Sequence, residues 1–353
     1  MTRTFHAIGQ GAFYTEKFEN GFTIVYDCGG QNKKFIVNKI QEVFQKNEKI
    51  DILFISHFHN DHINGVDFLL EYCDVKKVVL PFLHDNMKLQ FIIENLKNRS
   101  YNQFIVNAII NPQDTFKEQE LVFVEPFSIN PNSTNINQYI NSNKIISNYI
   151  DQWIYIPYNI YFDDFALQLE VALKSQSIDI NNILDKIKTD KYNILNIYKS
   201  IIKESSFNTN SLIVYSGLSK DIDLKLQNIT FVNSEVITSN KVGCLYLGDA
   251  ELKVDKEMKK VKYLFTNYWD DISVVQIPHH GSYKNFNDQL AWKDSISIIS
   301  TGFRYSHPSQ KVVEDIKSQD SICAIVSYDK STQVIQQIPL EYVVEEFYPE
   351  YLI

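Results

Sequence analysis

Residues 55–65 read ISHFHNDHING and gather three histidines and an aspartate, although the whole chain of 353 residues has only eight histidines. Histidine titrates near neutral pH and binds metal ions through either ring nitrogen, so this cluster indicates metal or acid–base chemistry. A histidine-rich surface loop is the alternative, and the specific HxHxDH spacing argues against it. The four residues of this motif are His57, His59, Asp61 and His62.

The spacing within the motif predicts two neighbouring metal positions. His57 and His59 are two residues apart just after an apolar run, so an extended backbone would point both imidazoles to one side. Asp61 and His62 follow a change of direction and can face a second point, which suits two ions ~3.5–4 Å apart. A closed structural zinc site would more often use cysteine thiolates, so this ligand set favours a site with open positions.

Other segments carry a resemblance that agrees with this interpretation. SHFHNDHINGV resembles the signature of the metallo-β-lactamase superfamily. Four other segments resemble further motifs of that superfamily: YDCGG (26–30), LYLGDAE (245–251), IPHHGS (277–282) and RYSHPS (304–309). Six of the eight histidines lie in these motifs: His57, His59, His62, His279, His280 and His307. The resemblance implies a hydrolase of α/β class with an αββα four-layer sandwich, in which two mixed sheets face each other and helices cover them.

Three more segments narrow the resemblance to one branch of the superfamily. GQGAF (9–13), NTNSLIVYS (208–216) and GFRYSHPS (302–309) make the set similar to the soluble hydrolase domain of ComEC-type DNA-uptake proteins. The similarity covers roughly residues 3–80 and 207–320. It includes neither the membrane channel of that family nor residues 130–206.

The resemblance implies roles for the motif residues. His57 and His59 would hold one metal ion, Asp61 and His62 the other, and Asp249 would bridge both. One of His279 and His280 would complete the ligands while the other faces the substrate, and we favour His280 as the ligand. The ions would lower the pKa of a bound water toward ~7 and make hydroxide available to attack the substrate. Asp61 would orient this nucleophile.

Further polar residues would support the ligands or contact the substrate. Asp27 is expected to accept an imidazole N–H and fix its tautomer, with a simple turn residue as the alternative. His307 could stabilise an oxyanion or protonate the leaving group. Arg304 and Lys284 could bind phosphate, or remain solvated surface cations.

One departure from the superfamily pattern concerns the second metal. Many members have a histidine shortly before the strand that begins here at Ser211, whereas this chain reads SSFNTNSL over 205–212. Asn208 or Asn210 could supply a weak oxygen ligand, or an additional water could take that position. Zn²⁺ is still the expected ion, but oxygen ligands at this position would also suit Mn²⁺, which is the alternative.

Composition limits the partners. The net charge of −9 argues against nucleic-acid binding through bulk electrostatics, so a DNA substrate would need a local basic groove. The four cysteines form no CxxC pair and are expected to be reduced thiols. No signal-peptide pattern and no run of ~18 apolar residues occurs, so we expect a cytoplasmic protein without a membrane partner.

The elements around the motifs follow an α/β pattern. Strands are expected at 3–8, 12–18, 22–28 and 51–56, with a helix over 33–46, and in the second half at 211–216, 243–249, 272–281, 295–302 and 321–328. We expect one domain over 1–353. Residues 130–206 would be an insertion over one face of the core, with helices near 163–174, 177–188 and 190–203, and would act as a lid over the metals.

These features predict a metal-dependent hydrolase that cleaves phosphodiesters, most simply a nuclease acting on DNA. A hydrolase of small phosphodiesters, such as a cyclic nucleotide or a phosphocholine-type ester, is the alternative enzyme. A third alternative is a latent effector that a partner protein activates, as in stand-alone relatives from bacterial defence loci. The sequence makes no prediction of oligomeric state.

Overall fold

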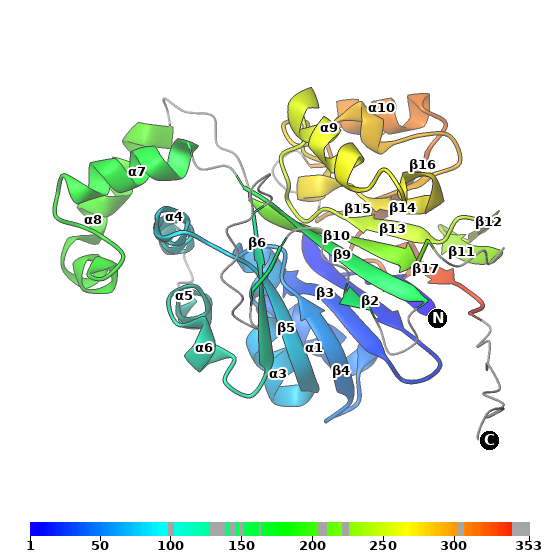
Figure 1. Cartoon of the computed structure of the whole chain (residues 1–353), viewed down its shortest axis with the longest axis horizontal. Helices are drawn as coiled ribbons and strands as arrows, with labels where there is room; N and C mark the ends of the chain where they lie inside the picture. The colour runs from blue at the N-terminus through cyan, green and yellow to red at the C-terminus, as the bar shows by residue number, and fades with distance from the viewer. Residues whose placement is uncertain are drawn as a thin grey trace, which may run out of the picture.

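The computed structural model describes residues 1–97, 102–126, 139–141, 146–147, 152–161, 164–202, 210–220, 226–302 and 307–340. Its strands form two sheets that face each other, with helices on the outer side of each (Figure 1). The predicted αββα sandwich is therefore confirmed. No helix among the described residues is long and apolar enough to cross a lipid bilayer.

The first sheet has ten strands. Strands β3 to β7 are parallel to one another, whereas the other neighbours in this sheet pair antiparallel. In sheet order the strands are β12 (Glu235–Ser239), β11 (Asn228–Val232), β17 (Val334–Gln337), β1 (Thr2–Phe5), β2 (Gly11–Lys17), β3 (Thr23–Gly30), β4 (Lys49–Phe54), β5 (Asp74–Pro81), β6 (Glu120–Glu125) and β7 (Tyr139–Asn141).

The second sheet has seven strands, parallel from β13 to β16 and antiparallel from β8 to β13. In sheet order they are β16 (Ile322–Val326), β15 (Ile296–Ser300), β14 (Ile272–Gln276), β13 (Gly243–Tyr246), β10 (Ser211–Leu218), β9 (Trp153–Ile160) and β8 (Ile146–Ser147). The strands predicted around the motifs are therefore present, most of them shorter than predicted at one end.

Three apolar clusters hold the layers together. One lies between the sheets and includes Tyr26 and Phe54 of the first sheet and Tyr246 of the second. A second joins the outer face of the first sheet to its helices α1 (Lys33–Val43), α3 (Val66–Tyr72), α4 (Asp85–Lys97), α5 (Gln103–Ile110), α7 (Asp164–Lys174) and α8 (Ile183–Ile202). The third joins the second sheet to α9 (Asp255–Leu264) and α10 (Gln310–Ser318). Shorter helices are α2 (Asn60–Ile63), α6 (Pro112–Thr115), η1 (Trp269–Asp271), η2 (Pro278–Gly281), η3 (Asp288–Leu290) and η4 (Lys330–Thr332).

The region predicted as an insertion is partly built into the core. Strand β9 is buried along its whole length and pairs with β10 in the second sheet, so the prediction of an insertion over the core is wrong for residues 153–160. The helical part agrees better, because α7 occupies 164–174 and α8 is interrupted at Asp190, where φ is −142° and ψ is 34°. Both helices pack on α4 (Figure 1).

Strands β9 and β10 pair as an antiparallel hairpin, and these two helices lie in the connection between them. Ile160, the last residue of β9, is paired with Ser211, the first residue of β10. The helices α7 and α8 therefore lie within the connection of a two-stranded antiparallel unit, and both ends of that connection meet at one point of the second sheet.

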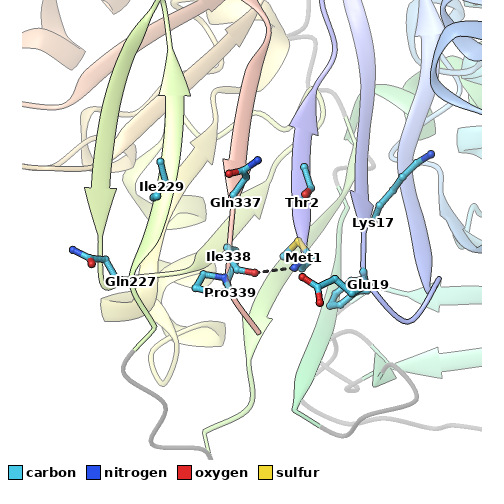
Figure 2. Close-up of a pocket in the computed structure, with 10 residues that line it drawn as sticks. Met1, Thr2, Lys17, Glu19, Gln227, Ile229, Gln337, Ile338 and Pro339 are labelled. Carbon is cyan, nitrogen blue, oxygen red and sulfur yellow. Dashed lines mark hydrogen bonds between the residues drawn. The ribbon is translucent and has the colours of Figure 1, made fainter. Parts of the chain in front are cut away.

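An open pocket of about 550 Å³ lies on the antiparallel side of the first sheet (Figure 2). Its wall includes the main-chain amine of Met1, which donates a hydrogen bond to the carbonyl of Ile338 at 2.8 Å. None of the site residues predicted from the motifs lines it.

Candidate metal centre

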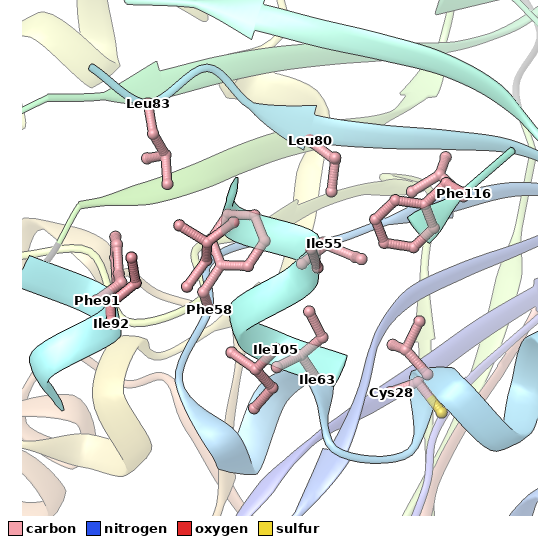
Figure 3. Packing of buried hydrophobic residues seen from close by; sticks show 14 of the residues in the cluster. Cys28, Ile55, Phe58, Ile63, Leu80, Leu83, Phe91, Ile92, Ile105 and Phe116 are labelled. Carbon is pink, nitrogen blue, oxygen red and sulfur yellow. The ribbon is translucent and has the colours of Figure 1, made fainter. Parts of the chain in front are cut away.

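In the HxHxDH motif, His57 and His59 lie in the loop between β4 and α2, whereas Asp61 and His62 lie on α2. Phe58 points into the outer apolar cluster, where its ring centroid lies 5.9 Å from that of Phe91 (Figure 3). The rings of His57 and His59 also lie near Phe91, with centroid distances of 6.4 Å and 5.5 Å, and His57 Nε2 lies 3.0 Å from His59 Nδ1. Packing around Phe91 thus holds the two imidazoles next to each other.

Asp249 lies in the turn after β13, and its neighbours fix its position. The side-chain oxygen of Gln276 accepts the amide N–H groups of Leu247 and Gly248, both at 2.7 Å. The amide of Asp249 donates to Ser211 Oγ at 3.2 Å, and its carbonyl accepts Asn285 Nδ2 at 3.0 Å. The main chain that carries this carboxylate is therefore held by β10, β14 and the loop after η2 together.

Gly248 permits this turn. Its φ is +53°, and an added Cβ would lie 2.2 Å from Ser211 Oγ and 2.8 Å from Ser56 Cβ. A side chain at this position would force apart the two sheets where they carry the ligands.

The carboxylate of Asp249 reaches both groups of histidines. Its Oδ2 lies 3.5 Å from His57 Nε2 and 4.0 Å from His59 Nδ1. Its Oδ1 lies 3.0 Å from His62 Nε2 and 4.0 Å from His280 Nε2. This is the placement expected of a carboxylate that bridges two cations.

Two sets of side chains have the spacing of metal ligands. His57, His59 and Asp249 form one set, and Asp61, His62 and His280 form the other, with the ligand atoms of each set within 4.8 Å of one another. His280 Nε2 lies 3.2 Å from Asp61 Oδ2. The two sets contain the pairs that the motif places together, and the second set contains His280 and not His279.

The buried atoms at the centre fit a divalent cation. Among the described residues, His62 Nε2 and Asp249 Oδ1 are buried without a hydrogen-bond partner, although they lie only 3.0 Å apart. Buried polar atoms are normally hydrogen-bonded, so two that face a common point indicate an absent partner. Imidazole nitrogens and carboxylate oxygens are ligands that zinc and manganese accept.

The second nitrogen of each histidine ligand has its own partner, as metal-binding histidines require. His62 Nδ1 donates to Asp27 Oδ2 at 2.7 Å, and Asp27 also accepts the amide and the hydroxyl of Ser56, both at 2.6 Å. His57 Nδ1 lies 2.9 Å from Ser56 Oγ. His280 Nδ1 donates to the carbonyl of Ser300 at 2.9 Å. Asp27 therefore lies where an orienting residue was predicted.

The motifs do not predict the partner of His59. Glu94 of α4 is buried, and its Oε2 lies 2.8 Å from His59 Nε2. The other oxygen, Oε1, accepts Gln90 Nε2 at 3.0 Å and the hydroxyl of Tyr198 at 3.1 Å. The signal that could have found it is the pair of polar residues one helical turn apart, Gln90 and Glu94, within the apolar run LQFIIENL.

Burial and neighbouring charges set the protonation of the metal-free site. Burial lowers the pKa of His57 to about 3, so its imidazole is neutral. Burial acts against protonation of His59 as well, but hydrogen bonds to Asp249 and Glu94 raise its pKa to about 10. Burial disfavours ionised Asp249, but the nearby histidines, His279 first, hold the pKa of this carboxyl well below its usual range. A carboxylate ionised at neutral pH is ready to bind a cation.

The remaining predicted residues lie around this centre in different ways. His279 Nε2 lies 3.9 Å from Asp249 Oδ2, and its ring centroid is 5.6 Å from that of His307. Burial lowers the pKa of both imidazoles, that of His307 to about 4. Asn210 is buried with its side-chain amide 2.9 Å from the sulfur of Met87, and Lys284 is exposed. Asn208 and Arg304 lie outside the described residues.

Residues 15–126 match the family model of the metallo-beta-lactamase superfamily. No curated protein matches the sequence.

Two solved structures are similar to the chain at low identity. MEM-A1, a subclass B3 metallo-beta-lactamase from a soil metagenome library, has 9% identity and a TM-score of 0.32, with 79% of this chain and 76% of that chain covered. Zn(2+)-bound PqqB from Methylobacterium extorquens has 6% identity and a TM-score of 0.39, with 90% and 86% covered. The family-model match over residues 15–126 includes the HxHxDH motif and the strands β3 to β6, and the two facing sheets with outer helices have the architecture of the metallo-β-lactamase fold.

Proposed function

We propose that the protein is a metal-dependent hydrolase that cleaves phosphodiester bonds at a dinuclear site. The observation that carries the proposal is the position of Asp249, whose two carboxylate oxygens each face one of the two ligand sets. Two bound divalent ions would supply a water acidified to a pKa of ~7 and would neutralise charge on the phosphate.

The chain's own residues would complete the reaction. Asp61 lies at the more open edge of its set, with about a quarter of its side chain exposed, and can accept a hydrogen bond from the attacking water. His279 and His307 lie side by side next to Asp249, and each has a buried Nδ1 without a hydrogen-bond partner among the described residues. As neutral imidazoles they can donate hydrogen bonds to a phosphate oxygen or to the leaving oxygen.

DNA is the substrate we favour, on the similarity of the motifs to the ComEC-type hydrolase domain. The net charge of −9 opposes this choice, so cleavage of DNA should depend on local cations such as Lys284. A small phosphodiester remains the alternative, and it would need no extended basic surface.

A screen of the purified protein with added Zn²⁺ or Mn²⁺ tests the proposal. The substrates are single- and double-stranded DNA, RNA, cyclic nucleotides and bis-p-nitrophenyl phosphate, with the Asp249→Ala variant as the control. Turnover of at least one diester by the wild type and not by the variant is expected. Protein that binds two ions and cleaves none of these substrates would contradict the hydrolase as stated and favour a latent effector.

A further inference from the structure

We propose that Tyr198 of α8 is a positioning residue for the first metal position, acting through Glu94 on His59. The inference rests on the proposed metal centre and adds to it the helices α7 and α8, which share no motif with the ligands. These helices would then be part of the support of the site and not only a cover over it.

The first step is the contact between Glu94 and His59. Because Glu94 Oε2 lies 2.8 Å from His59 Nε2, that nitrogen carries the proton and donates it to the carboxylate. To bind an ion, His59 must give up the proton on Nδ1, which faces His57 Nε2 and Asp249 Oδ2, while Nε2 keeps the proton that it donates to Glu94. Glu94 thus decides which nitrogen of His59 is offered to an ion.

The second step is the support of Glu94 itself. Its side chain is only 7% exposed, and a buried carboxylate needs hydrogen bonds to both oxygens. While Oε2 faces His59, Oε1 accepts Gln90 Nε2 at 3.0 Å and the hydroxyl of Tyr198 at 3.1 Å. Gln90 lies on the same helix as Glu94, whereas Tyr198 is 104 residues away in sequence and fixes the carboxylate from outside α4.

The third step concerns how Tyr198 is held. Its ring is buried and packs at 5.6 Å, edge to face, on Phe165 of α7, and Lys97 Nζ lies 4.5 Å from its centroid. The hydroxyl therefore reaches Glu94 only when α7 and α8 are docked on α4. Docking of these helices and binding of metal at His59 are linked by this geometry, so each must favour the other.

The test uses Tyr198→Phe, which removes the hydroxyl and keeps the ring in its packing. The control is Tyr192→Phe on the same helix, because Tyr192 is 79% exposed. Both variants are titrated with Zn²⁺ against a competing chelator and with Co²⁺ by visible absorption. The variant His57→Asn is titrated in the same way, because the binding step that it loses is the one that belongs to the first metal position.

Loss of such support around a metal ligand typically weakens binding by about 10–100-fold. We expect Tyr198→Phe to weaken the step that His57→Asn abolishes by roughly 10-fold and to change the Co²⁺ spectrum. The affinity of Tyr198→Phe at the other metal position should equal that of the wild type. Tyr192→Phe should have wild-type affinity at both positions. Wild-type affinity for both ions in Tyr198→Phe overturns the inference.

Two further measurements keep the outcome decisive. Circular dichroism and urea unfolding of the metal-free variants separate a loss of fold from a loss of positioning. If Tyr198→Phe does not fold, Gln90→Met tests the same oxygen of Glu94 from within α4, and wild-type metal affinity there overturns the inference equally. Because the readout is metal binding, a failure of the hydrolase proposal would appear separately, as absent turnover with both steps intact.

Discussion

The four histidine ligands of the candidate centre are held by three kinds of group. His62 contacts a carboxylate, His57 a hydroxyl, His280 a main-chain carbonyl and His59 a carboxylate from another helix. The spacing of the HxHxDH motif predicts the four ligands within it, because a short extended segment and one helical turn bring them together, whereas Asp249 and His280 were predicted from the resemblance alone. Their partners do not follow, with the exception of Asp27, because residues far away in sequence approach them only after the chain has folded.

At the level of single residues, Asp61→Asn should lower kcat for the diester substrate by about 10²–10⁴-fold. The change keeps the size of the side chain but removes the charge that the second ligand set and the attacking water require. The measurement is kcat with both ions bound, with metal-free urea unfolding as the control for the fold. A doubly loaded variant with wild-type turnover would show that Asp61 has no part in the chemistry.

A second prediction at this level concerns Gly248→Ala, with Gly21→Ala as the matched control. Both glycines have positive φ, +53° and +85°, but an added Cβ meets Ser211 Oγ at 2.2 Å in the first case and nothing within 4 Å in the second. Both variants should lose about 1–2 kcal/mol of stability from backbone strain, and Gly248→Ala should lose more because its Cβ also overlaps with Ser211 and Ser56. Only Gly248→Ala should also lose metal affinity, because it displaces Asp249. If the two variants bind metal equally well, the turn at Gly248 does not position Asp249 for metal binding.

At the level of elements, the sequence predicts those that carry motifs better than those that do not. The apolar run at 51–56 becomes β4 at 49–54, since a short and almost wholly apolar run is typical of a strand buried on both faces. Strand β9 was missed because WIYIPYNI contains Pro157 and follows an Asn-rich stretch. The structure accepts this proline because β8 pairs only with Tyr155 and Ile154, so no described strand needs an N–H from residue 157 on that side.

The hairpin formed by β9 and β10 allows a direct test of whether α7 and α8 limit access. Residues 162–209 are replaced by a short Asn-Gly-containing turn, which the pairing of Ile160 with Ser211 can accept. At saturating metal, cleavage of DNA should rise relative to that of bis-p-nitrophenyl phosphate, because a polymer needs more room. The measurement is the ratio of the DNA cleavage rate to the bis-p-nitrophenyl phosphate cleavage rate. A change in metal occupancy affects both rates equally and therefore leaves this ratio unchanged.

The same variant also reports on packing. It uncovers apolar side chains of α4, so its unfolding midpoint should fall and it should bind a hydrophobic dye. A ratio unchanged from the wild type would leave the helices as a support for α4 and for Glu94, without a role in access.

At the level of the whole molecule, a buried ion pair within the first sheet binds hydroxyl groups of the second sheet. Arg3 Nε donates to Glu16 Oε1 at 2.7 Å, and both side chains are fully buried. Glu16 also accepts the hydroxyls of Ser216 at 2.8 Å, Tyr155 at 2.8 Å and Tyr246 at 2.9 Å, all from the second sheet. The network satisfies the carboxylate completely, and nothing in the local sequence around either residue predicts it.

Glu16→Ala should therefore lower the free energy of unfolding by about 3–5 kcal/mol, because it leaves the Arg3 guanidinium buried without its counter-charge. The control is Asp315→Ala, which breaks the exposed pair with Lys311 on α10 and should cost less than about 1 kcal/mol. Urea unfolding of the metal-free proteins gives both values. Similar losses in the two variants would mean that the network does not hold the sheets together.

The division of the ligands between the two halves of the chain has a consequence for the order of folding. His57, His59 and His62 follow β4 of the first sheet, whereas Asp249 and His280 follow β13 and β14 of the second. Contacts between segments so distant in sequence close late, because their loop entropy is large. During synthesis the HxHxDH segment emerges long before its bridging carboxylate exists. In a refolding experiment, the appearance of a Co²⁺ spectrum would accordingly time the moment at which the two sheets meet.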